Sequence, residues 1–405
     1  MDAHALHAID PLIIGERLAD ARRARRITQQ QAAAELGVAR TTVTAMEKGM
    51  RRPRASELVK LAQFYGRSVA DFVREETVTT PNFAVHFRAV RGVEAARAEK
   101  DVQRFGELCR WYVELEEQLG APLPRRYPPV YEVAGTAPER AAEEVAASER
   151  NRLGLGDGPI GNLWGLLESD VGLRVFALPL SNGRIAGMFL YTEEYGGCIA
   201  VNANHPEERR RWSAAHEYAH FLTDRFQPEI TVLNLYKRVP ENERFADAFA
   251  RVFLMPASGL SRRFEAVRRA KHAPITPADL LALSHLYHVS FQAMTWRLEE
   301  LKLLPLGTWD RLKDMGFKPN TARELIYLPA HQPELPNLPL RYVALAVQAH
   351  EAGLLTEGQL AERLGADRVG ARERVRAFTT EAEPTADGDW QQVSLDLSKS
   401  LLGVS

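Results

Sequence analysis

The sequence of 405 residues contains little cysteine and no long hydrophobic run. Cys109 and Cys198 are the only cysteines, too few for a disulfide framework and without zinc-site spacing, so we expect a reducing, cytoplasmic environment. No stretch approaches the ~18 apolar residues of a membrane span, and the start lacks the charged-then-apolar pattern of a signal peptide. These absences predict a cytoplasmic protein with no membrane partner. We also identify no internal repeat and no low-complexity tract.

The chain also lacks an overall excess of charge of either sign. It has 52 Lys and Arg against 53 Asp and Glu, so composition alone does not indicate a nucleic-acid partner. Residues 12–67, however, hold 12 Lys or Arg against 5 Asp or Glu, a local excess of seven positive charges. A basic module on an otherwise neutral chain can bind DNA phosphates through counterion release.

The same basic segment has the pattern of a bundle of five short helices. Thr28 followed by a glutamine three residues later predicts a helix cap, and Gly37 predicts the end of that helix in a tight turn. The next helix turns Val43 and Met46 toward the core. This order predicts a helix-turn-helix. The five expected helices are 14–25, 28–36, 39–48, 55–65 and 68–72.

The helix-turn-helix resembles the Xre/Cro type, including the ending Met46 to Gly49 and the basic loop that follows. The resemblance implies binding to double-stranded DNA as a homodimer, because such modules read paired half-sites. We expect Arg40 and Thr41 to contact base edges and the basic or amide side chains to contact phosphates. The alternative is a helical bundle with a merely solvated cationic face. The residues expected to face DNA are Gln29, Arg40, Thr41, Thr42, Ala45, Lys48, Arg51 and Arg52.

The strongest chemical signal is an H-E-x-x-H motif, formed by His216, Glu217 and His220 within a helical pattern. Residues at i and i+4 lie on one helix face, so both imidazoles can bind one metal ion while Glu217 stands beside it as a free carboxylate. Catalytic zinc takes three protein ligands and keeps a fourth position for water. The motif therefore predicts a third ligand downstream. A structural role for the zinc is the alternative.

A second helical pattern begins shortly after the motif and offers that ligand. Glu243 lies 23 residues past His220, and Asp247 follows it at i+4 on the edge of an apolar face. We expect Glu243 to be the third zinc ligand and Asp247 to accept the second N–H of a ligand histidine, which fixes its tautomer. Glu241 is the rival for the ligand position.

The run from Ile199 to Pro256 resembles the ImmA/IrrE family of bacterial zinc metallopeptidases, and the similarity extends over residues 137–305. It is carried by a short strand, an Arg-rich approach, the H-E-x-x-H helix and the pattern E-x-x-A-D-x-F-A. Phe245 is one departure, because many relatives have a second acidic residue there. The resemblance implies a zinc metallopeptidase that cleaves helix-turn-helix repressors during stress or DNA damage. Manganese could replace zinc on the same ligands.

The expected fold is mainly α with a small β-sheet (α+β). We predict a helix-turn-helix domain at 1–76, a helical linker at 77–136, a zincin-like peptidase domain at 137–305, and a helical C-terminal region with a polar tail at 306–405. Within the linker, Phe105, Leu108, Tyr112 and Leu115 recur at helical spacing, which favours ordinary packing over a dimer-forming helix. Residues 356–378 have the outline of a second helix-turn-helix, which we do not assign.

Together these patterns predict a DNA-binding transcriptional regulator with zinc-dependent endopeptidase activity, cleaving a repressor or another regulatory protein. Glu217 is the expected general base. The candidates for stabilising the oxyanion are Tyr236, His285 and His288, and residues 197–202 could present an edge strand to an extended substrate. The alternative is a non-catalytic transcription factor or antitoxin-like protein whose zincin domain is a sensor or interaction module.

Overall fold

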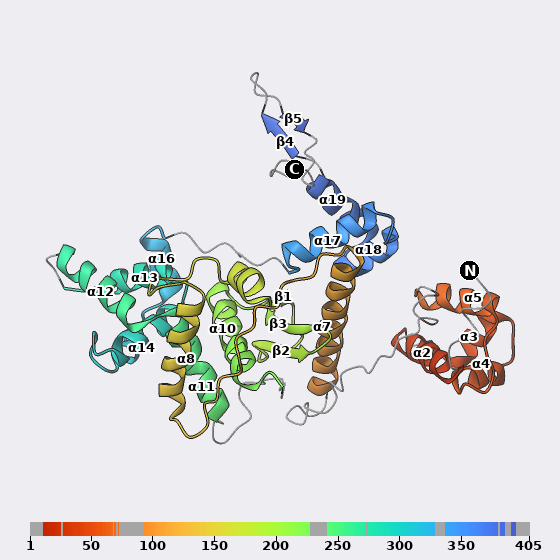
Figure 1. Ribbon diagram of the computed structural model, residues 1–405, viewed down its shortest axis with the longest axis horizontal. Helices are drawn as coiled ribbons and strands as arrows, with labels where there is room; N and C mark the ends of the chain where they lie inside the picture. Colours follow the sequence, from red (N-terminus) through yellow and green to blue (C-terminus); the bar gives the residue numbers. More distant parts are fainter. Residues whose placement is uncertain are drawn as a thin grey trace, which may run out of the picture. The chain divides into compact units, whose positions relative to one another are not determined.

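The computed structural model divides the chain into two compact units, Met1–Thr80 and Pro81–Ser405 (Figure 1). Each unit is described by itself. Among the described residues, no helix combines the length and the apolar character needed to cross a membrane. The structure describes residues 11–25, 27–67, 69, 72, 93–226, 241–271, 274–328, 337–379, 381–384 and 390–393.

The first unit is a bundle of short helices around one apolar core. Ile14, Val43, Met46 and Leu58 are each at most 1% exposed and come from three different helices. The described helices are α2 (Pro11–Ala24), α3 (Gln29–Leu36), α4 (Arg40–Glu47) and α5 (Ala55–Tyr65). Most of the fifth predicted helix, residues 68–72, lies outside the described residues.

The turn between α3 and α4 has the geometry that the sequence predicts. The Thr28 hydroxyl accepts a hydrogen bond from the backbone N–H of Gln31, whose side chain accepts one from the Thr28 N–H. At the other end Gly37 adopts φ 69°, a left-handed conformation that ends the helix without the steric cost of a β-carbon. The chain therefore reverses sharply between α3 and α4.

The second unit is built around a three-stranded sheet of β1 (Arg174–Leu178), β2 (Gly187–Thr192) and β3 (Gly196–Asn202). The strand order is β1-β3-β2, with β3 parallel to β1 and antiparallel to β2. The prediction that residues 197–202 form an edge strand is therefore wrong. Both edges of β3 are paired, because β2 folds back onto it through a short turn while β1 joins it from the other side.

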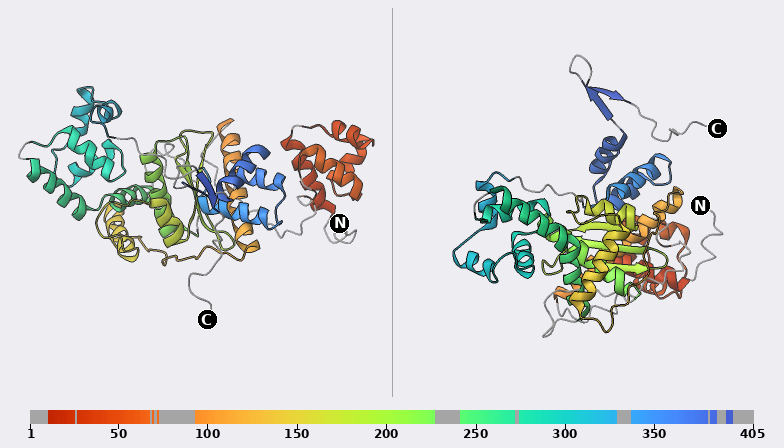
Figure 2. Two further views of the ribbon diagram at one scale, coloured as in Figure 1. Left: turned by 90° about the horizontal axis from the view of Figure 1, so that it is seen from above. Right: turned by 60° about the vertical axis from the view of Figure 1, so that its left-hand side comes forward.

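Alternate side chains of the strands enter two separate cores, as the two-residue period of a strand requires. Val175 and Ile199 face a core formed with α10 and α11, whereas Phe176 and Ala200 face a core formed with α7 and α17. The sheet is thus covered on both faces (Figures 1 and 2). Covering on both faces explains why β1 and β3 are buried along their whole length.

A large group of helices shares the first core, on one face of the sheet. Tyr218 of α10 is fully buried against Phe249 and Phe253 of α11, with ring centroids 5.9 and 5.8 Å away. The helices of this region are α8 (Pro138–Arg152), α9 (Leu163–Gly165), the π-helix η3 (Leu166–Val171), α10 (Glu207–Asp224), α11 (Glu241–Leu254), α12 (Ala257–Lys271), α13 (Pro277–Leu286), α14 (Phe291–Glu300), α15 (Thr308–Asp314) and α16 (Pro319–Leu325).

The second face of the sheet is covered by helices that are far apart in the sequence. Tyr112 of α7 packs edge-on against both Phe176 and Tyr342, and Glu116 accepts hydrogen bonds from Arg174 and Arg341. The apolar stripe of α7 is buried within this unit, as the packing interpretation predicts. The remaining elements of this unit are α7 (Val93–Gln118), which precedes the sheet in the sequence, and five that follow α16. These five are α17 (Leu340–Glu351), α18 (Glu357–Leu364), α19 (Arg368–Thr379) and the hairpin strands β4 (Glu381–Pro384) and β5 (Trp390–Val393).

Candidate metal centre and nucleic-acid interface

The H-E-x-x-H motif lies in the middle of α10, the helix that packs against the sheet. Its apolar side, with Ala215, Ala219 and Leu222, is fully buried in the first core. On α8, Glu149 accepts a hydrogen bond from the Tyr218 hydroxyl, and Arg152 donates one to that hydroxyl at 3.1 Å, which ties α8 to α10. The motif is therefore presented by a helix that is held on several sides, as a preorganised site requires.

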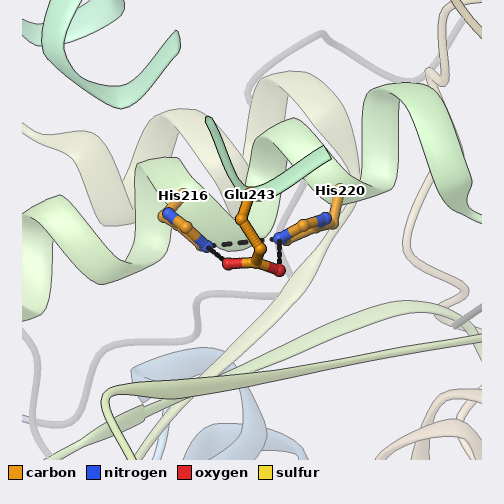
Figure 3. Close-up of side chains that lie close together, drawn as sticks. All are labelled: His216, His220 and Glu243. Carbon is orange, nitrogen blue, oxygen red and sulfur yellow. Dashed lines mark hydrogen bonds and ion pairs between the residues drawn. The ribbon is translucent and has the colours of Figure 1, made fainter. Parts of the chain in front are cut away.

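The two histidines and Glu243 bring their donor atoms together at one point (Figure 3). Nε2 of His216 lies 3.2 Å from Nε2 of His220, and each nitrogen lies 3.4 Å from one Glu243 oxygen. Ligand atoms bonded to a tetrahedral zinc ion at ~2.1 Å are separated by about 3.4 Å. These spacings match three corners of a tetrahedron, so the group could hold a metal ion.

Two acidic residues that the sequence singled out occupy different places on α11. The Asp247 carboxylate lies 3.0 Å from Nδ1 of His216, on the ring side opposite Glu243. Burial lowers the pKa of His216, but its hydrogen bonds to Asp247 and Glu243 outweigh burial and raise it to about 10. The site therefore favours a positive charge at the position where a cation would lie. Glu241, the rival ligand, is exposed and is not part of the group.

Glu217, between the two histidines of the motif, is 2% exposed and lines a small cavity together with His216. Burial raises the pKa of its carboxyl group above the usual value. Its Oε2 atom has no hydrogen-bond partner among the described residues. A buried carboxylate oxygen without a partner costs free energy, so its retention points to a ligand or a reaction rather than to stability. The burial of Glu217 and the raised pKa of its carboxyl group both suit a group that exchanges a proton with a bound molecule.

Gly187, at the start of β2, allows the strand to lie directly against Glu217. A β-carbon on Gly187 would lie 2.7 Å from Oε1 of Glu217. The sequence gives no signal for this close approach, because the contact joins a strand to a helix about 30 residues away. β2 pairs with β3 alone among the described strands, so its other edge is the one beside the motif that could bind an extended chain.

A small cavity and a large one meet at the motif. The small cavity, of ≈ 30 Å³, is lined by His216 and Glu217 and has room for about one water molecule. The large cavity, of ≈ 1070 Å³, lies between α10, α11 and the α14–α16 region and contains Trp296 and Trp309. Trp212 and Asp247 line both. The small cavity beside the motif therefore adjoins a space large enough for several side chains.

The two oxyanion candidates that the structure describes, His285 and His288, do not gather at the motif. His285 and His288 are half-buried near Glu208 and Arg323 and do not line the small cavity. Tyr236 lies outside the described residues. Asp224 was not predicted from the sequence, although its carboxylate lies 3.8 Å from Nδ1 of His220. Asp224 lies four residues after His220 on α10, and this i, i+4 spacing could have predicted the contact.

In the first unit, some of the predicted DNA-facing residues are exposed and others are half-buried or bonded within the unit. Arg40, Thr41 and Lys48 are exposed on or just after α4, whereas Thr42 and Ala45 are half-buried. The helix therefore presents its N-terminal turn and its end outward. Arg51 and Arg52, in the loop after α4, are half-buried, and Arg51 forms an ion pair of 2.9 Å with Glu57.

Gln29 is bonded within the unit rather than projecting from it. Its amide nitrogen donates to Glu47, and its carbonyl oxygen accepts from the Thr44 hydroxyl. Arg22 of α2 donates to both oxygens of Glu47, at 2.6 and 3.0 Å. This pair was not predicted from the sequence, and it fixes the C-terminal end of α4 relative to α2 and α3. Gln29, Thr28 and Arg40 line an open depression on this face.

Comparison with known families assigns both regions. Residues 18–72 match the family model described as "Helix-turn-helix", and residues 168–299 match the peptidase model described as "IrrE N-terminal-like domain". The chain thus matches an Xre-type helix-turn-helix model and an IrrE/ImmA-like peptidase model in one polypeptide. This confirms the recognition made from the sequence, and the mainly α architecture with its small sheet confirms the fold class. The IrrE-like domain contains all three donor residues and Glu217.

Other comparisons add little. One solved structure, described as "Crystal Structure of ComR from Streptococcus suis", is similar over 91% of this chain and 94% of that chain, at 10% identity and a TM-score of 0.16. This likeness is too weak to carry an argument. No curated protein matches the chain. The assignments therefore give a regulator with a DNA-binding helix-turn-helix domain and a peptidase-like domain.

Proposed function

We propose that this protein is a DNA-binding regulator whose IrrE-like domain is a zinc-dependent endopeptidase. The observation that carries the proposal is the combination at α10 and α11. Three nitrogen and oxygen donors lie 3.2–3.4 Å apart, beside a buried carboxylate with an unpartnered oxygen. Each part has an ordinary explanation alone, but together they match the needs of metal-assisted hydrolysis.

The donor set fits zinc in number, type and spacing. Two imidazoles and one carboxylate are typical of catalytic zinc, which keeps a further position for water. His216, His220 and Glu243 would hold the ion, and manganese fits the same ligands. When bound, such an ion polarises a carbonyl group and lowers the pKa of water toward about 7.

The chain's own residues would supply orientation and proton transfer. Asp247 accepts the Nδ1–H of His216 and so leaves Nε2 free to bind the ion. Glu217, whose raised pKa favours proton uptake, would take a proton from water and pass it to the leaving amine. Gly187 keeps β2 close enough for a peptide backbone along that strand to reach Glu217.

A protein, rather than a small molecule, is the proposed substrate. An extended segment could pair with β2 through main-chain hydrogen bonds, which place few demands on its sequence. The large cavity beyond Trp212 would receive apolar side chains of that segment, because Trp296 and Trp309 supply apolar surface there. Selection would depend on this cavity and on docking elsewhere.

The fusion to a DNA-binding domain favours a regulatory protein as substrate, in a stress or DNA-damage response. Two designs are compatible with it. The helix-turn-helix domain, acting as a homodimer, could bring the peptidase to an operator where a repressor is bound. Alternatively, the whole chain is the repressor and cleaves itself or a partner on a signal.

The test compares cellular proteins after DNA-damaging stress in cells with the wild type, Glu217→Gln and Glu241→Gln. Each variant loses one carboxylate, that of Glu217 in the middle of α10 or that of Glu241 at the start of α11. Glu241 is exposed and lies outside the donor group, so its variant is the control. We expect a cleavage product with the wild type and Glu241→Gln, and none with Glu217→Gln, while metal content stays at about one zinc per chain in all three. Absence of any product with the wild type would instead support the non-catalytic alternative, a sensor or interaction module.

A further inference from the structure

The C-terminal helices repeat the sequence of the helix-turn-helix at the other end of the chain. Aligned from Thr28 and Thr356, the segments 28–40 and 356–368 share six of their 13 residues. The shared residues are the threonine at the start, the glutamine three places later, an alanine, the Leu-Gly pair of the turn and the arginine that begins the next helix. The similarity spans only one supersecondary unit, which is why no repeat was identified from the sequence.

The repeated residues perform the same structural roles in both places. The Thr356 hydroxyl accepts from the Gln359 N–H at 3.3 Å, and the Gln359 side chain accepts from the Thr356 N–H at 2.8 Å. The equivalent distances at Thr28 and Gln31 are 3.2 and 2.8 Å. The first helix of each pair therefore begins with the same cap.

The turn after α18 matches the turn after α3. Gly365 adopts φ 61°, and Gly37 adopts φ 69°. The residue after each glycine donates its N–H to the carbonyl four residues before that glycine: Ala366 to Ala361 at 2.9 Å, and Val38 to Ala33 at 3.0 Å. α18 and α19 thus meet through the same turn as α3 and α4.

The C-terminal pair is also packed like a helix-turn-helix. Leu360 and Ala361 are buried at the positions of Ala32 and Ala33, and Ala371 is buried at the position of Val43. α17 packs against both α18 and α19, and supplies the supporting helix. Arg363 of α18 forms an ion pair of 2.8 Å with Glu114 of α7, which anchors the motif to the second unit.

α19 presents a basic outer face. Arg368, Arg372 and Arg376 recur at i, i+4 and i+8, and all three are exposed, although Arg372 also forms an ion pair of 3.0 Å with Glu357 of α18. Arg368 and Arg376 take the positions of Arg40 and Lys48 in the first domain. Val369 is the single large apolar residue exposed on this helix among its described side chains. A protein interface needs an apolar centre, which this face lacks, so its charge favours phosphates.

We propose that α17–α19 form a second helix-turn-helix that binds the phosphate backbone of double-stranded DNA through Arg368, Arg372 and Arg376. The proposal does not depend on the peptidase activity. It gives the chain two DNA-binding modules, so that both ends of one polypeptide can hold DNA and each raises the effective concentration of the other.

The test measures binding of the full chain to a random-sequence duplex by fluorescence anisotropy over a series of salt concentrations. The starting protein carries Arg40→Ala and Arg52→Ala, which weaken the first domain. To it we add Arg368→Gln, Arg372→Gln and Arg376→Gln. The matched control instead adds Arg262→Gln, Arg268→Gln and Arg269→Gln, three exposed arginines of α12 with the same change in charge.

We expect the α19 variant to bind at least about tenfold more weakly, and its log–log salt dependence to flatten by up to about 0.9 for each phosphate that it no longer neutralises. The α12 control should match the starting protein. Lysine at the same three α19 positions should restore binding, because charge and not fork geometry is required. Equal affinity and slope in the α19 and α12 variants would overturn the proposal. Loss of a protein partner from the α19 variant with unchanged DNA binding would overturn it as well.

Discussion

The candidate metal centre and the candidate DNA-binding face of the first domain present their polar groups in opposite ways. At the centre, His216, Glu217, His220 and Glu243 are all buried. On the face, Arg40 and Lys48 are exposed to solvent. Both sets are polar, but only the buried set must be compensated inside the protein.

Buried polar groups need partners within the fold, whereas exposed polar groups are satisfied by water. A buried polar atom needs a partner, so the donor spacing at the centre and the unpartnered Glu217 oxygen point to a site for a ligand. An exposed arginine is satisfied by water with or without DNA. The DNA face is therefore supported by its helix-turn-helix geometry and family assignment, and its individual contacts need mutational tests.

Removing one donor of the candidate metal centre should have the largest effect. His216→Ala should reduce zinc from about one ion per chain to near zero, because two donors hold the ion far more weakly than three. DNA binding should be unchanged. Mass-spectrometric metal analysis after dialysis provides the measurement. His205→Ala, which changes a histidine hydrogen-bonded to a loop carbonyl outside the donor group, should keep its zinc.

Gly187→Ala tests whether β2 must lie directly against Glu217. The new β-carbon would lie 2.7 Å from the carboxylate, so either the strand or Glu217 has to move. A displacement of this kind costs about 10²-fold in the rate of substrate cleavage. Gly183→Ala is the control, since a β-carbon there contacts nothing within 4 Å. Equal cleavage rates for the two variants would separate β2 from the reaction.

Asp247→Asn tests the support of His216. The amide accepts the imidazole N–H less strongly than the carboxylate does, so we expect metal affinity to fall about 10–100-fold. Competition with a chelator measures the change. Asp224→Asn should have a smaller effect, because its carboxylate lies 3.8 Å from His220 rather than at hydrogen-bond distance. The reverse order would show that Asp224, and not Asp247, is the main support.

On the candidate DNA face, Arg40→Ala should weaken binding to a specific site by about 1–3 kcal/mol, as expected for the loss of a bidentate hydrogen bond to a base. Arg52→Ala should instead lower affinity across all sequences and flatten the salt dependence. Anisotropy with specific and random duplexes distinguishes the two effects. Small, equal decreases for both variants would mean that this face does not read DNA.

The smallest expected effect concerns pH. Burial acts to raise the pKa of Glu47, but hydrogen bonds from Arg22 and Gln29 outweigh it and lower the pKa below 4.5. A lowered pKa in the folded state contributes stability above about pH 4.5, which is lost as the pH falls through the folded-state value. Amide hydrogen exchange in α2 and α4 should therefore accelerate on acidification. Glu47→Gln should make that dependence shallower, and an unchanged dependence would contradict the assigned ion pair.

Local spacing accounts for what could be predicted at the centre. The i, i+4 relation of His216 and His220 follows from helix geometry, and the pattern from Glu243 to Asp247 follows from the same rule. The contact of Gly187 with Glu217 had no such signal, since it joins a strand to a helix. The prediction that residues 197–202 form an edge strand was wrong for the same reason, because the sequence of one strand does not show which strands pair with it.

The order of amino acids alone was sufficient for the helix-turn-helix, the H-E-x-x-H helix and their family resemblance, because each is set by periods and caps that act within a few residues. The tertiary structure decided which strand lies at the edge, which residues close around Glu217, and that α7 and α17 cover one face of the sheet. These depend on burial of apolar surface between segments far apart in the chain, where one folded arrangement out of many excludes the most water.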